Sequence, residues 1–241
     1  MPAEHAELLV ADDGLEALRP EIEADEPHAC ETSAVNYFGH AAVASWRNGR
    51  GGLPLGAMLP DFGTMSGARV TGTSDPDVAA GIELHHATDA VFHQLAPVTA
   101  LMRELDQRLE RAGCARGPRR GVAHIGVELL LDGVLLDESA YRDAYVLGLE
   151  YEAPLMFRDD GDDQRLTALL ERLRTYGVPD DLRRPEAIVQ RLARMLGRRP
   201  LLAPSPQDLA TIAVALVEHK PRVEIAADTV MRALRAGLPS S

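Results

Sequence analysis

The sequence predicts an all-α protein built on a single helical domain. Hydrophobic residues make up 46% of its 241 residues and aromatic residues only 4%, which is typical of helical proteins with aliphatic cores. Apolar residues recur at helical spacing through most of the chain. We find no strand signal long enough to build a sheet. A chain of this length can bury one large core, so no second domain is required.

Two segments are expected. Residues 1–33 are acidic and contain Pro20 and Pro27, so we interpret them as an N-terminal extension with one short helix near 14–19. Residues 34–241 form the helical domain. Its first helix should begin near Asn36 and end at a glycine-rich loop after residue 47. A short helix over 56–62 follows, and residues 63–76, rich in Gly, Thr and Ser, indicate a flexible connection.

The next helix should begin at Asp75-Pro76, because Asp caps free backbone N–H groups and proline suits the first helical position. It is expected to run to about Leu95 and to be followed by a helix over 98–112. A basic loop at 116–120 then precedes a strongly apolar helix over 121–136. The supporting helices are expected near 138–150, 164–176, 185–196, 206–219 and 222–236, separated by glycine and proline.

Charge and cysteine content exclude several classes of protein. The formal net charge is −12, which argues against nonspecific binding to nucleic acid or to an anionic membrane. An acidic partner would need a local basic patch. Cys30 and Cys114 have no closely spaced second ligand, so they indicate neither a zinc site nor a disulfide framework. With no signal peptide and no long apolar run, we expect a cytoplasmic protein.

Two helices carry polar stripes of histidine and carboxylate side chains. On the helix over 76–95 the stripe consists of His85, Asp89 and His93, spaced by four residues and therefore on one face. An ion pair on a surface helix is the simpler interpretation of such a pair taken alone. However, imidazole and carboxylate ligands from successive turns can also converge on Mn²⁺ or Zn²⁺.

The second stripe, on the apolar helix over 121–136, consists of His124, Glu128 and Asp132. Burying carboxylates without partners costs several kcal/mol, roughly, for each group. Arginines from 115–120 could satisfy them structurally. Because two helices offer the same mixture of ligands, we favour metal binding, with the two stripes facing each other.

Four short sequence blocks occur in the same order and at about the same spacing as in a known family. They are NYFGH at 36–40, GAMLPDF at 56–62, DVAAGIELHHATD at 77–89 and VELLLDGVL at 127–135. They resemble the acyl carrier protein phosphodiesterase family, a divergent branch of the HD-type hydrolases. The third block is the most specific, because Ala-Gly-Ile, a histidine, three residues and an aspartate match in register. The resemblance spans about 36–136 and implies an HD-like helical domain, with 137–241 as supporting helices.

The resemblance implies a metal site made of His40, Asp61, His85, Asp89 and Asp132. Members of the family are similar to manganese-dependent enzymes that hydrolyse the phosphodiester between 4′-phosphopantetheine and a carrier-protein serine. Acyl carrier protein and Mn²⁺ are therefore the expected partner and cofactor. A bound ion can acidify water and stabilise phosphoryl charge, and the carboxylate of Asp61 or Glu128 could orient that water.

The sequence departs from the family pattern at Ala87, His93 and Gly133, which stand where the family has arginine, aspartate and histidine. We expect His86, His93 or His124 to substitute for the missing ligand or acid. Arg119 or Arg120 could supply the missing phosphate contact. Two alternatives follow. The substrate could be another phosphate ester, or the domain could be a non-catalytic module that binds a carrier protein. The oligomeric state is not predicted.

Overall fold

The computed structural model describes residues 37–47 and 51–239. Nine α-helices and one short 3-10 helix cover 76% of the described residues, which also form one small two-stranded sheet. The predicted all-α class is confirmed. The predicted extension over 1–33, with its short helix and Cys30, lies outside the described residues.

The elements are α1 (Tyr37–Ala44), α2 (Gly52–Ser66), β1 (Val70–Thr73), α3 (Pro76–Phe92), α4 (Ala96–Arg111), α5 (Arg116–Leu135), α6 (Ser139–Glu150), β2 (Leu155–Phe157), α7 (Asp162–Tyr176), the 3-10 helix η1 (Asp180–Arg183), α8 (Pro185–Leu196) and α9 (Pro206–Gly237).

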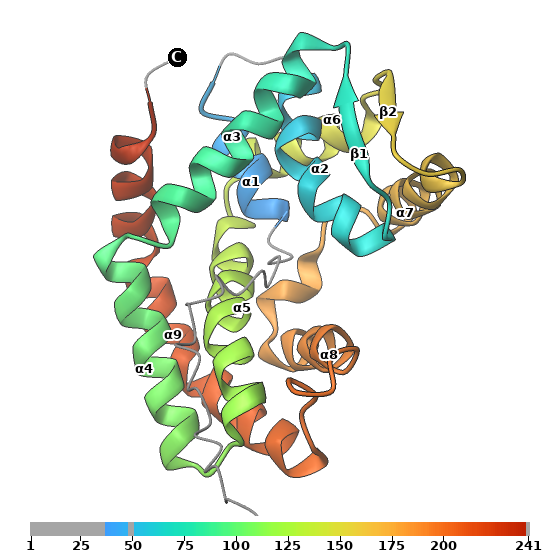
Figure 1. The fold of residues 1–241 in the computed structure, drawn as a ribbon. Coiled ribbons are helices and arrows are strands. Elements are labelled where there is room, and N and C mark those ends of the chain that lie inside the picture. Colours follow the sequence, from blue (N-terminus) through green and yellow to red (C-terminus); the bar gives the residue numbers. More distant parts are fainter. Residues whose placement is uncertain (1–36, 48–50, 240–241) are drawn as a thin grey trace, which may run out of the picture. The chain divides into compact units, whose positions relative to one another are not determined.

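Helix α5 is the central element of the core. It packs against α4, α8 and α9 and also contacts α1 and η1 (Figure 1). Apolar side chains occupy most of its circumference, and Val122, Leu129 and Leu130 are almost completely buried. A helix that is apolar on nearly all sides must be enclosed by neighbours. Any polar group on its buried length is therefore also enclosed, which applies to Glu128 and Asp132.

Helices α2 and α3 approach each other closely because each has a glycine at the contact. A Cβ atom on Gly81 would lie 2.3 Å from the carbonyl oxygen of Leu53, and one on Gly56 would lie 2.1 Å from that of Val78. Only glycine permits this backbone separation. The start of α3 is as predicted, since Asp75 accepts hydrogen bonds from the backbone N–H groups of Asp77 and Val78.

The structure corrects several predicted boundaries. Helix α2 covers 52–66, so part of the expected connection is helical, and α5 begins at Arg116, so the expected basic loop is its first turn. The two helices predicted after residue 206 form one helix, with Pro221 inside it. Strands β1 and β2 pair antiparallel, although each is too short to be recognised by alternation. Among the described residues, no helix is both long and apolar enough to cross a membrane.

Candidate metal centre

Side chains from α1, α2 and α3 meet in a cluster that we call the first centre: His40, Asp61, His85 and Asp89. His40 Nε2 lies 3.2 Å from Asp89 Oδ1 and 4.0 Å from Asp61 Oδ2. His85 Nε2 lies 3.3 Å from Asp89 Oδ2. Ligand atoms of His40, His85 and Asp89 all lie within 4.8 Å of one another, so this group could hold a metal ion. The Asp89 side chain is 38% exposed, which opens the first centre to solvent.

The main chain of α2 holds the ring of His85 in place. Its Nδ1 atom lies 2.9 Å from the carbonyl oxygen of Ala57. Because that oxygen can only accept a hydrogen bond, Nδ1 carries the proton, and Nε2 of the neutral ring presents a lone pair to Asp89. Burial and the neighbouring His40 lower the pKa of His85 to about 3. At neutral pH Nε2 is therefore unprotonated. Its lone pair and the Asp89 carboxylate can both coordinate a metal cation.

His40 is the second buried imidazole of the first centre. Its ring stacks on that of His85 with centroids 3.9 Å apart and an angle of 27° between the planes. Neither ring nitrogen of His40 has hydrogen-bond geometry to any described group, although Nε2 lies close to Asp89. Buried polar atoms in folded proteins almost always have a partner. A metal ligand satisfies this requirement, so the buried atoms fit a bound cation.

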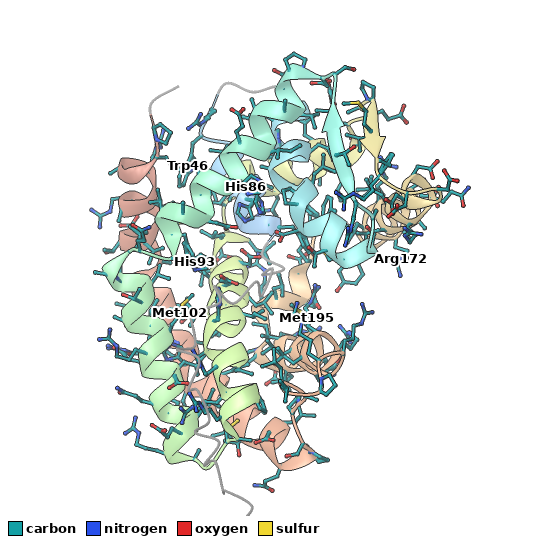
Figure 2. The ribbon with its side chains drawn as sticks, in the orientation of Figure 1. Trp46, His86, His93, Met102, Arg172 and Met195 are labelled. Carbon is teal, nitrogen blue, oxygen red and sulfur yellow. The ribbon has the colours of Figure 1, made fainter. Side chains whose placement is uncertain are left out.

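A second group of ligands lies where the end of α3 meets α5, and we call it the second trio: His93, His124 and Glu128. Glu128 Oε1 lies 3.0 Å from His124 Nε2 and 3.7 Å from His93 Nε2. The two rings meet edge to face, with centroids 4.7 Å apart. Figure 2 labels His86, which lies on α3, and His93, which follows the last residue of that helix. The ligand atoms of the second trio also lie within 4.8 Å of one another, so this group too could hold a metal ion.

Asp61 is almost completely buried, and its electrostatic surroundings are unfavourable for a carboxylate. Burial, reinforced by the negative charges of Asp89, Glu128 and Asp132, raises the pKa of Asp61 well above its ordinary value. The ion pairs that Asp61, Asp89 and Glu128 make within the described residues are with histidines, not with lysine or arginine. A concentration of buried carboxylates of this kind is stabilised by a cation.

Asp132, an expected metal ligand, belongs to neither of the groups of ligand atoms. It is enclosed between α5 and α1, where burial and Glu128 raise its pKa well above the ordinary value while the backbone N–H of Gly39 acts in the opposite direction. Asp132 and Glu128 also line a small cavity of about 20 Å³ together with His40. This volume is enough for one water molecule.

The two polar stripes do not converge on one position as the sequence predicts. His85 and Asp89 join the first centre, His93 and His124 join the second trio, and Asp132 is in neither group of ligand atoms. The reason lies in α1 and α2, which supply His40 and Asp61. These two side chains form a site with the first two residues of the α3 stripe, His85 and Asp89. Sequence spacing shows which side chains share a helix face but not which neighbouring helix they meet.

The expected phosphate-binding arginines are placed elsewhere. Arg119 forms ion pairs with Asp106 and Glu110 of α4, and Arg120 is exposed on the first turns of α5. His86 is also exposed, and it meets the ring of His85 edge to face at 5.3 Å rather than joining the ligand atoms. None of these three side chains is part of either group of ligands.

The structure explains why position 133 holds glycine. A Cβ atom on Gly133 would lie 2.3 Å from the carbonyl oxygen of Leu182 in η1. A side chain such as histidine cannot be placed there unless η1 moves. The histidine of the family pattern is therefore incompatible with the way this chain packs η1 against α5.

A wide groove is lined by side chains next in the sequence to two residues of the first centre, and no sequence motif indicates it. It has a volume of about 690 Å³ and its lining includes Pro60 and His86, the chain neighbours of Asp61 and His85. Arg69 and Arg158 also line it. They come together because β1 and β2 pair, with the backbone N–H of Arg158 donating to the carbonyl oxygen of Arg69 at 3.0 Å.

Comparisons with protein-family models, with curated proteins and with solved structures find no match for this chain. The resemblance to the acyl carrier protein phosphodiesterases therefore depends on the four sequence blocks. The site geometry described above is independent of that resemblance.

Proposed function

We propose that this protein is a divalent-metal-dependent phosphodiester hydrolase whose ion is held by His40, Asp61, His85 and Asp89. One observation carries the proposal: the ring of His85, oriented by the carbonyl of Ala57, presents Nε2 to the Asp89 carboxylate 3.3 Å away. The mixed imidazole and carboxylate ligands suit Mn²⁺ and Zn²⁺, and the family resemblance favours Mn²⁺.

The residues of the first centre have different parts in this proposal. A divalent cation supplies an acidified water and stabilises negative charge on phosphoryl oxygens. His85 is held in its ligand orientation by Ala57, and Asp61 contributes the negative charge that balances the cation inside the core. Asp89, the ligand with an exposed edge, lies where a substrate can approach. Glu128 contacts His93 and His124, whereas Asp61 lies 4.0 Å from His40, so we assign the orientation of water to Asp61.

The proposed reaction is hydrolysis of a phosphodiester. An oxygen of water forms a bond to phosphorus, the bond from phosphorus to the leaving oxygen breaks, and a proton of the water ends on that oxygen. For the substrate implied by the resemblance, the products are 4′-phosphopantetheine and a carrier protein whose serine hydroxyl is restored.

The groove lined by His86, Arg69 and Arg158 is the proposed docking site for the anionic part of the substrate. Arginine is well suited to phosphate and carboxylate recognition. The overall charge of −12 would otherwise repel an acidic carrier protein, and these two arginines provide the local positive charge that such a partner needs. They replace Arg119 and Arg120 in the proposal, because Arg119 is engaged by α4.

Hydrolysis of a different phosphate ester is the second candidate function. It is favoured by Ala87, which stands where the family has arginine, and by the position of Arg119 away from the first centre. In that case the same metal centre would act on a substrate without a carrier protein.

The test uses chelator-treated full-length protein supplemented with MnCl₂ and assayed on holo carrier protein and on bis(4-nitrophenyl) phosphate. We expect Mn²⁺-dependent hydrolysis that is lost in His85→Ala and Asp89→Asn and kept in the control Arg120→Ala. Much faster turnover of holo carrier protein than of small esters identifies the first substrate, and the reverse identifies the second candidate. Absence of hydrolysis of both substrates, with metal bound, would refute the proposed activity.

A further inference from the structure

The second trio places one buried carboxylate, that of Glu128, beside two imidazoles. Glu128 is 1% exposed, yet neither of its carboxylate oxygens has hydrogen-bond geometry to a described group. Its close neighbours are the imidazoles of His93 and His124. Enclosing a carboxylate without hydrogen bonds is unfavourable unless a charge of opposite sign is bound beside it.

The ligands come from positions that the fold keeps fixed. His124 and Glu128 lie one turn apart on α5, the most enclosed helix, and His93 follows the last residue of α3 as its C-cap. The side chains of His93 and His124 are 35% and 26% exposed. The trio is therefore anchored in the core at its carboxylate and open to solvent at its imidazoles.

We propose that His93, His124 and Glu128 bind a second divalent transition-metal ion, separate from that of the first centre. Two imidazoles and one carboxylate form a three-ligand set that leaves a coordination position open, as in catalytic zinc sites. Two nitrogen ligands and a single carboxylate favour Zn²⁺ over the harder Mg²⁺ and Ca²⁺, which prefer oxygen ligands.

The two ions would lie along one helix. Asp89 of the first centre lies in the last turn of α3, and His93 of the second trio, four residues later, is the C-cap with helical dihedral angles, so the two side chains lie on the same face, one turn apart. Asp89 and His93 are both partly exposed. A phosphodiester bound at this face could contact both ions, an arrangement that stabilises both the attacking and the leaving oxygen. Binding of the second ion does not depend on the proposed hydrolase activity.

The test measures metal stoichiometry rather than turnover. Chelator-treated full-length protein is titrated with ZnCl₂ by calorimetry, and bound zinc is counted by plasma mass spectrometry after dialysis. We expect two ions per wild-type chain, one in His124→Ala, one in His85→Ala and none in the double variant. The control Arg120→Ala, an exposed residue of α5 outside both groups of ligands, should keep both ions. Circular dichroism verifies that each variant folds, and His93→Ala replaces His124→Ala if the latter unfolds.

Each alternative outcome has one meaning. If the wild type binds a single ion that His85→Ala loses and His124→Ala keeps, the second site does not exist while the first centre stands. If the wild type binds two ions and both remain in His124→Ala and in His93→Ala, the ligand assignment is wrong. If His124→Ala loses the only ion and His85→Ala keeps it, the second site stands and the first centre fails.

Discussion

His85 Nδ1 lies 2.9 Å from the carbonyl oxygen of Ala57, across the interface between α3 and α2. This contact exists because Gly56 and Gly81 allow the two helix backbones to touch. An outer partner of this kind fixes the tautomer and direction of a metal-ligating histidine. The packing of two glycines thus determines the geometry of a ligand.

Replacing Gly81 by alanine should therefore disturb both stability and metal binding. Its methyl group would lie 2.3 Å from the Leu53 carbonyl oxygen, so the helices must separate, at a cost of about 1–3 kcal/mol. The matched control is Gly126→Ala, whose methyl would meet only side-chain atoms, with Leu216 at 3.2 Å, Val122 at 3.5 Å and Leu105 at 3.6 Å. Urea unfolding and zinc titration of both variants check this. Equal behaviour of the two variants would contradict the role given to Gly81.

Removal of the metal should lower the stability of the wild type more than it lowers the stability of the variant Asp61→Asn. The carboxylate of Asp61 is repelled by Asp89, Glu128 and Asp132, and we expect a bound cation to offset this repulsion. In chelator at neutral pH, Asp61→Asn should melt at a higher temperature than the wild type. Its free energy of unfolding should be larger by an amount on the order of 1 kcal/mol. With Mn²⁺ added the order should reverse. A variant that is less stable than the wild type in both conditions would show that Asp61 has only a packing role.

The groove arginines should affect substrate affinity and not the metal. Arg69→Ala and Arg158→Ala are each expected to raise KM for holo carrier protein about tenfold, with kcat nearly unchanged, because the proposed lost contacts dock the carrier protein and do not hold the ion. Arg120→Ala, an exposed arginine on α5, is the control. Steady-state kinetics at low salt measures the difference. A fall in kcat at constant KM would place these arginines at the reacting phosphate instead.

Acid sensitivity should depend on Asp208, which joins the start of α9 to the start of α5. The backbone N–H of Ala115 and the hydroxyl of Ser205 lower the pKa of Asp208 to about 2. Because the folded-state pKa is depressed, the stabilisation is present above the ordinary value of 3.8 and is lost as the pH falls toward 2. With solvent screening, Asp208→Asn should cost roughly 1–2 kcal/mol at pH 7. Urea unfolding at pH 7 and pH 2.5 should show that this difference shrinks at the lower pH.

The sequence predicts the helices well because their signals are local. The cap at Asp75 and the apolar length of α5 are properties of neighbouring residues, and both appear in the structure. The histidine and carboxylate stripes are local in the same sense. Their division into the first centre and the second trio depends on contacts between helices, which spacing along one helix does not contain.

Long-range features account for the rest. The pairing of Arg69 with Arg158 arises from two strands that are each three or four residues long. Arg119 carries a suitable charge for phosphate but has acidic neighbours on α4 that only the packed structure reveals. The glycine at position 133 looked like a lost ligand, and the structure shows that η1 occupies the space.

Anomalous diffraction from crystals soaked in MnCl₂ tests the central claim most directly. A peak is predicted at the first centre, about 2 Å from Nε2 of His40 and His85 and from a carboxylate oxygen of Asp89. The same crystals of His85→Ala should lack it. A well-ordered crystal with no peak among these side chains at millimolar Mn²⁺, or with peaks only on the surface, would contradict the claim.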